Sequence, residues 1–150
     1  MTDYKLLAMQ IKSFAQEDPH WVPLLSNAAA LLWEALPDIN WAGFYTVEGE
    51  LLVLGPFQGK PACIHIEKGR GVCGTAWEQD QAQLVPDVHQ FPGHIACDSA
   101  SNSEVVVPIH ADGRVCAVLD IDSPLQGRFT QEDLIGLAAF TEKLEEEVQW

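Results

Sequence analysis

Residues 105–122 read VVVPIHADGRVCAVLDID and carry a clear fold signal. Two runs rich in valine, isoleucine and leucine flank Asp112-Gly113, a dipeptide that favours the two-residue turn of a β-hairpin. We therefore predict two antiparallel strands, at Val105–Ile109 and at Arg114–Ile121. A hairpin at this place favours an antiparallel sheet.

A second hairpin is expected earlier in the chain. Strand-prone residues over Ile39–Phe57 lie on both sides of the turn sequence Glu-Gly-Glu at 48–50. Short strands are also predicted at Ala62–Ile66 and at Leu84–Val85. The middle of the chain is therefore expected to be mostly sheet.

Helices are predicted at both ends of this run of strands. Apolar residues recur three and four apart over Asp3–Phe14 and over Trp21–Leu36. A closing helix begins after Thr130, whose side chain can cap it together with Asp133. Its buried stripe is expected to consist of Leu134, Leu137, Leu144 and Val148. Helices that flank the strands rather than alternate with them predict an α+β fold, with the amino- and carboxy-terminal helices packed on one face of the sheet.

The amino-acid composition excludes some classes of function. The chain has 150 residues, 47% hydrophobic and 20% charged, which fits one globular domain over residues 1–150. Its formal net charge of −14 repels phosphate backbones and anionic lipids, so neither nucleic acid nor a membrane is expected as a partner. Because Met1–Phe14 lacks the features of a secretory signal, we expect a cytoplasmic protein with reduced thiols.

A glycine pattern raises the question of a nucleotide cofactor. The sequence GRGVCG at 69–74 satisfies the Gly-x-Gly-x-x-Gly pattern of dinucleotide-binding turns. A helix from Val72 must end near Gln79, however, and no strand-helix-strand unit follows. A tight turn that opens a short helix is therefore favoured, and no cofactor is predicted.

Zinc is a second alternative, because three cysteines and three histidines are possible ligands. None of them forms the closely spaced pairs typical of zinc sites, so no metal is predicted. The candidates are Cys63, Cys73, Cys97, His65, His89 and His94. The fourth cysteine, Cys116, lies in a run of valine, alanine and leucine and is expected to be a small buried hydrophobe.

Two carboxylates share one face of the last predicted strand. Because side chains alternate along a strand, Asp120 and Asp122 point to the same side, about 6.6 Å apart. In a partly dry site their repulsion keeps one of them protonated, where it can donate a proton. Two solvated carboxylates at a strand end are the alternative, and the sequence does not decide between the two.

A cysteine in a polar stretch points to redox chemistry. Cys97 lies in GHIACDSASNSE at 93–104, which is too small and polar for a core element and predicts a loop. An accessible thiol with a second thiol nearby is typical of reactive cysteines, and Cys63 and Cys73 are the candidate neighbours. An inert loop cysteine is the alternative. Because negative charge raises thiol pKa values, backbone N–H groups of residues 98–101 are expected to stabilise the thiolate.

Five stretches of the sequence together resemble the free methionine-R-sulfoxide reductases, which are single GAF-domain enzymes. The resemblance extends over residues 39–148, and the run through Cys97 is its most specific part. Sensory GAF domains share the fold and lack this set of cysteines. The stretches are NWAGFY at 40–45, GKPACIHI at 59–66, GRGVCGTAW at 69–77, VPDVHQFPGHIACDSASNSEVVVPI at 85–109 and AVLDIDSP at 117–124.

The resemblance implies a GAF-like fold and a cytoplasmic oxidative-stress repair enzyme. Such an enzyme reduces free L-methionine R-sulfoxide to methionine, assembles as a homodimer and is recycled by thioredoxin. By the same resemblance Cys97 is the nucleophile, Cys63 the principal resolving thiol and Cys73 an additional recycling thiol. Whether Cys63 or Cys73 dominates recycling stays open, and Cys116 matches no motif of the family.

The resemblance also places residues around the substrate. Trp41 and Tyr45 match positions that contact its methyl end. Three acids match the positions of its pocket: Glu104, Asp120 and Asp122. In such a site Cys97 attacks the sulfoxide sulfur while a neutral carboxyl protonates the departing oxygen. The remaining carboxylates hold the substrate ammonium, and which acid has which role stays open.

A function from another class is compatible with the same residues. A GAF sensor would bind a small ligand, and its thiols would report the redox state without turnover. Consumption of the R epimer of methionine sulfoxide by the reduced protein distinguishes the enzyme from the sensor.

Overall fold

Both predicted hairpins lie in one sheet. The computed structural model describes residues 1–95 and 97–150. Its six strands have the order β3-β2-β1-β6-β5-β4, and every neighbouring pair is antiparallel, as predicted. The strands are β1 (Trp41–Glu48), β2 (Leu51–Gly59), β3 (His65–Glu67), β4 (Gln83–Val85), β5 (Ser103–Ala111) and β6 (Arg114–Ser123).

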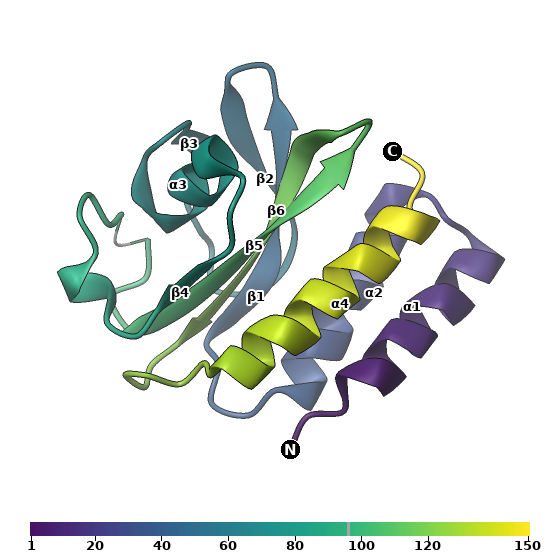
Figure 1. Ribbon diagram of the computed structural model, residues 1–150, viewed down its shortest axis with the longest axis horizontal. Helices are drawn as coiled ribbons and strands as arrows, with labels where there is room; N and C mark the ends of the chain where they lie inside the picture. The colour runs from purple at the N-terminus through teal and green to yellow at the C-terminus, as the bar shows by residue number, and fades with distance from the viewer. Residues whose placement is uncertain (96) are drawn as a thin grey trace.

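One face of the sheet carries the terminal helices, as expected (Figure 1). Alternate residues of β5 and β6, such as Val107 and Leu119, point into this layer and are buried. The helices contribute Ile11, Leu25 and Phe140 to the same core. They are α1 (Tyr4–Glu17), α2 (Trp21–Ala35) and α4 (Gln131–Glu147).

The opposite face carries a smaller layer. It consists of α3 (Gly71–Gln79), the 3₁₀ turn η1 (Val88–Gln90) and connecting loops (Figure 1). Its core contains Val72 and Ala76 of α3 together with Val118 of β6. Because the even-numbered residues of β6 face this layer, Asp120 and Asp122 point toward it.

The capping of α4 confirms the predicted signal. Thr130 Oγ1 accepts a hydrogen bond from the Asp133 amide at 3.2 Å, and Asp133 Oδ2 accepts one from the Thr130 amide at 2.9 Å. This reciprocal pair is a capping box, which stabilises the first turn. Of the expected stripe, Leu137 and Leu144 are buried, whereas Leu134 and Val148 are half-buried.

Several predicted elements have different bounds, and β4, β5 and β6 are each longer than predicted. The first helix extends to Glu17 rather than Phe14. The strand predicted at 62–66 begins only at His65. Before it, the Cys63 carbonyl accepts a hydrogen bond from the Tyr45 hydroxyl at 3.0 Å, and the Ile64 carbonyl accepts one from the Leu54 amide of β2 at 2.9 Å.

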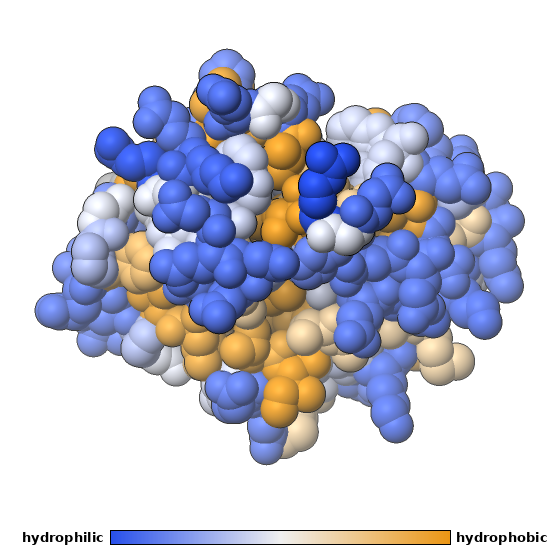
Figure 2. Space-filling model, turned by 45° about the horizontal axis from the view of Figure 1, so that its top comes forward, coloured by the Kyte–Doolittle hydropathy of each residue, from blue (hydrophilic) through white to orange (hydrophobic). Residues whose placement is uncertain are grey.

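Most of the face in Figure 2 is hydrophilic, with hydrophobic residues exposed between the polar ones in the centre and lower part of the view. The large exposed apolar side chains include Met9 of α1, Trp33 of α2 and Ile135 of α4. Within the described parts of the chain, no helix combines the length and apolar character needed to cross a membrane.

Candidate active site

The three acids of the predicted pocket lie side by side on the sheet face that carries α3. Asp122 of β6 pairs with Trp41 of β1 on one side and with Glu104 of β5 on the other. Asp120 lies two residues earlier on β6, and therefore on the same face, opposite Gly43 of β1. The register of the three central strands thus assembles the acids.

The acids are largely withdrawn from solvent. Glu104 and Asp120 are each 6% exposed, and Asp122 is half-buried. Burial raises the pKa of all three carboxyls, and negative neighbours raise those of Glu104 and Asp122 further. Hydrogen bonding from Glu104 and Cys73 opposes the rise of the Asp120 pKa. The alternative of two solvated carboxylates is therefore wrong.

Two oxygens in this cluster have no hydrogen-bond partner among the described residues, Asp120 Oδ1 and Asp122 Oδ1. His94 Nε2 lies 3.8 Å from Glu104 Oε1, but burial lowers the pKa of this histidine, which favours its neutral form. Within residues 1–95 and 97–150, no lysine or arginine forms an ion pair with the acids. Enclosed acceptors without partners favour a ligand that carries hydrogen-bond donors or positive charge.

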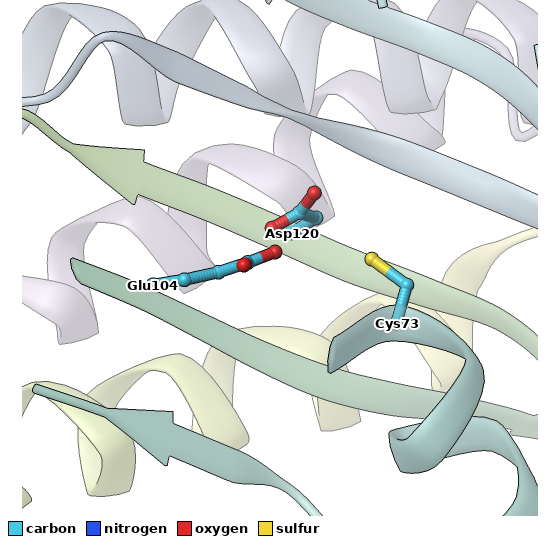
Figure 3. A group of neighbouring side chains, drawn as sticks. All are labelled: Cys73, Glu104 and Asp120. Carbon is cyan, nitrogen blue, oxygen red and sulfur yellow. The ribbon is translucent and has the colours of Figure 1, made fainter. Parts of the chain in front are cut away.

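Cys73 extends the acidic cluster from above the sheet. Figure 3 shows its sulfur on α3 pointing toward Glu104 of β5 and Asp120 of β6, and the donor atoms of the three residues lie within 4.8 Å of one another. Gly71, with φ +61°, starts the helix at this place, as expected for the glycine turn. Burial and the two nearby acids raise the pKa of Cys73, so this thiol stays protonated. Without a compensating charge, the three groups form a cluster that shares protons.

The exposed cysteine is joined to a second cysteine. Cys97 lies exposed on a loop, as predicted, and forms a disulfide with half-buried Cys63, with their Cα atoms 5.7 Å apart. The two residues are 34 positions apart in the chain. Of the two candidate neighbours, Cys63 is therefore the partner in this state, and Cys73 is free and buried.

An aromatic wall borders the acids. Trp41 stacks on Tyr45 and Phe57, with ring centroids 5.9 and 5.2 Å away. Its Nε1 donates a hydrogen bond to the Lys60 carbonyl at 3.1 Å, which fixes the ring. A Cβ at Gly43 would collide with Phe57 and lie 2.8 Å from the Trp41 ring, so the glycine makes room for the wall. Trp41 and Tyr45 are both buried.

These groups line a cavity of about 50 Å³. Aromatic rings form one side, acids form the floor, and the Cys97 loop forms the rim. The lining residues include Trp41, Tyr45, Cys73, His94, Cys97, Ser101, Glu104, Asp120 and Asp122. All of the residues predicted for the site except Cys63 line this cavity, and Cys63 is bonded to one that does.

Some expectations for the cysteines need correction. The amides of Ala100 and Ser101 are not available to a thiolate, because they donate to Asp98 at 2.9 and 3.2 Å within the turn. Cys116 is half-buried rather than fully buried, and burial raises its pKa to about 11.

Sequence analysis assigned no role in substrate binding or catalysis to two polar residues beside the site. His94 lines the cavity, and Asn40 hydrogen-bonds to Asp98 and Ser101 in the turn after Cys97. Both residues lie in the stretches that resemble the family, but their contacts are with other segments of the chain, which a local pattern does not reveal.

Comparisons with known proteins agree with this geometry. Residues 18–148 match the GAF domain family. The free methionine-R-sulfoxide reductase of Escherichia coli is 59% identical over 121 residues, which cover 81% of this chain and 73% of that protein. A structure of fRMsr of Staphylococcus aureus in its reduced form is 49% identical, with a TM-score of 0.95 over 99% of this chain and 97% of that one. The free methionine-R-sulfoxide reductase from Neisseria meningitidis, in complex with its substrate, is 44% identical, with a TM-score of 0.92 over 96% and 87% of the two chains.

Proposed function

The chain belongs to the GAF-domain family of free methionine-R-sulfoxide reductases, and we propose that it reduces free L-methionine R-sulfoxide with Cys97 as the nucleophile. One observation carries the proposal. The Cys63–Cys97 pair stands at a pocket whose acids include two enclosed oxygens without partners in residues 1–95 and 97–150. A reactive cysteine pair beside acids that retain protons is what sulfoxide reduction requires.

The first step transfers oxygen from substrate to enzyme. In the reduced protein, Cys97 attacks the sulfoxide sulfur and a neutral carboxyl of the pocket protonates the departing oxygen. The S–O bond of the substrate is lost, its sulfur is reduced by two electrons, and Cys97 is oxidised to a sulfenic acid. Glu104 and Asp122 are the proposed proton donors, because burial and negative neighbours raise their pKa values and so favour the protonated form.

The second step resolves the sulfenic acid. The Cys63 thiol attacks the Cys97 sulfur, a disulfide forms, and the oxygen leaves as water. The disulfide in the structure corresponds to this product. Cys73 is proposed as an additional recycling thiol, and because it is buried beside Glu104 and Asp120, it reacts only after a rearrangement that exposes its sulfur.

Recognition of a free amino acid fits the same pocket. The ammonium group is proposed to bind Asp120 Oδ1, which has no partner among the described residues, while Asp122 supplies a second acceptor. The methyl end packs against Trp41 and Tyr45, which offer an apolar wall. A methionine sulfoxide inside a peptide has no free ammonium to fill the first of these sites.

Recycling requires an external dithiol. Following the family resemblance, we propose thioredoxin as the reductant, a homodimer as the assembly and the cytoplasm as the location. A dithiol exchanges with the disulfide, becomes oxidised and returns Cys63 and Cys97 to thiols. Cys97 is exposed, which gives the reductant access.

An epimer assay tests the function. Reduced protein is incubated with racemic free methionine sulfoxide and dithiothreitol, and both epimers are quantified on a chiral column. We expect loss of the R epimer alone, release of methionine, and no loss of N-acetylmethionine sulfoxide, the matched control without an ammonium. An unchanged R epimer with normal thiol oxidation by peroxide would favour the sensor instead.

A further inference from the structure

We propose that Asn40 is a positioning residue that sets where Cys97 stands over the pocket, an inference that rests on the proposed function. Asn40 Nδ2 donates one hydrogen bond to Asp98 Oδ2 and one to Ser101 Oγ, each at 3.0 Å. Asp98 follows Cys97 directly, and Ser101 closes the same turn. One side chain thus holds both ends of the turn that carries the nucleophile.

Asn40 itself is anchored to the strand of acids. Its backbone N–H donates to the Asp122 carbonyl at 2.9 Å. The next residue, Trp41, is the first of β1 and pairs with the same Asp122. The amide of Asn40 therefore connects the Cys97 turn to the rigid sheet edge from which the acids project.

The turn presents a charged acceptor to Asn40. Asp98 Oδ1 accepts from the Ala100 amide at 2.9 Å, which leaves Oδ2 for Asn40. These hydrogen bonds, that from Ala100 above all, lower the pKa of Asp98, so the carboxylate is ionised and its bond to the amide is charge-assisted. Among residues 1–95 and 97–150, Asn40 is the sole side chain outside the turn that hydrogen-bonds to Asp98 or Ser101.

The carbonyl oxygen of the Asn40 side chain shows why the amide has this orientation. Its Oδ1 is enclosed and has no partner among the described residues. Rotating the amide by half a turn would set Oδ1 against the Asp98 carboxylate. The orientation with Nδ2 on the turn is therefore the one that the charge of Asp98 selects.

Exchanging the two side chains tests the contact. In Asn40→Asp, two carboxylates face each other, so the turn is repelled from the sheet edge. In the double variant Asn40→Asp/Asp98→Asn, the hydrogen bond re-forms in reverse, while the Oδ1 of the new asparagine still accepts from Ala100. Asn40→Ala removes both hydrogen bonds without adding charge. This variant replaces Asn40→Asp in the test if Asn40→Asp does not fold.

The readouts are kcat and KM for free methionine sulfoxide. Because Asn40 does not line the cavity, we expect the single variants to lower kcat by about 10- to 100-fold with KM within about threefold. The double variant is expected to recover most of kcat relative to Asn40→Asp. Wild-type kcat in Asn40→Ala, or a change confined to KM, would overturn the proposal. Asn102→Ala, which removes the side-chain contacts with the Pro124 carbonyl and with His89 Nε2 and none with Asp98 or Ser101, is the control expected to keep kcat.

A second readout does not depend on turnover. The equilibrium of the Cys63–Cys97 disulfide with a glutathione redox buffer reports how often the two sulfurs meet. We expect Asn40→Ala to shift the equilibrium constant about threefold or more toward the dithiol. Asn102→Ala is expected to leave the equilibrium constant unchanged. If the wild type fails the epimer assay, the proposed function fails, while this equilibrium still decides whether Asn40 positions Cys97.

Discussion

The Tyr45 hydroxyl donates a hydrogen bond to the carbonyl of Cys63 at 3.0 Å. Tyr45 lies on β1 among the acids, and Cys63 lies on the segment before β3 that crosses the pocket. Burial and the nearby acids raise the pKa of Tyr45, so its hydroxyl stays a donor throughout the neutral range. The aromatic wall therefore also holds the backbone of the proposed resolving cysteine.

Tyr45→Phe tests that contact. The substitution keeps the ring and removes the hydrogen bond, so we expect about 1 kcal/mol lower stability. Methionine release in a single turnover should stay close to wild type, while formation of the Cys63–Cys97 disulfide slows. Rapid-quench measurement of both products checks this. Equal slowing of the two steps would mean that the hydroxyl acts on the substrate rather than on Cys63.

Serine substitutions separate the two cysteines. Cys97→Ser should lose all turnover, because no sulfur remains to attack the substrate. Cys63→Ser should release one methionine per protein and then show impaired thioredoxin-dependent turnover, because the sulfenic acid has lost its principal resolving thiol. Methionine per protein, measured after a single addition of substrate, reports the difference. Multiple turnover by Cys97→Ser would assign the nucleophile to another residue.

The acid cluster predicts a pH dependence of stability. The folded pKa of Glu104 lies well above its ordinary 4.5, so the folded protein binds more protons than the unfolded chain. Stability from this group is then complete below pH 4.5 and is lost as the pH rises through the folded pKa. Glu104→Gln should flatten this fall and stabilise the protein at pH 7. Urea unfolding between pH 4 and 8 measures it, with Glu132→Gln, at an exposed position on α4, as the control.

The contacts of His110 predict a second loss of stability with rising pH, which begins at higher pH than that of Glu104. Its Nε2 contacts Asp80 Oδ1 at 2.6 Å and its Nδ1 contacts Glu145 Oε2 at 3.0 Å, which ties α3 to α4. Asp80, and then Glu145, raise the pKa of His110 above its ordinary 6.5. This contribution is complete below pH 6.5 and is lost as the pH rises through the folded value. His110→Gln should remove the slope, and Asp80→Asn should reduce it, in thermal unfolding at low salt.

Local signals predicted most of the sheet. Asp112-Gly113 marks the central hairpin, and the alternation along β6 correctly places Asp120 and Asp122 on one face. The resemblance named Cys63 as a partner of Cys97, and the disulfide joins the two. These features follow from turn chemistry, side-chain period and sequence motifs.

The remaining features depend on contacts between distant segments. Strand β3 begins only at His65, and the Cys63 carbonyl before it is hydrogen-bonded to the hydroxyl of Tyr45, 18 residues away. The burial of Asp120 follows from α3 and the loops that cover it, which no pattern around Asp120 reveals. Asn40 contacts residues 58 and 61 positions away. Periodicity describes one element at a time and carries no information on such pairings.

The alternation along β6 has an evolutionary consequence. Leu119 and Ile121 pack the strand against the helices, whereas their neighbours Asp120 and Asp122 line the pocket on the opposite face and contact any ligand bound there. Substitution of Asp120 and Asp122 therefore changes the ligand that the pocket prefers and leaves the packing of Leu119 and Ile121 in the core unchanged. The same fold can acquire new ligand specificities by mutation on one face of a single strand.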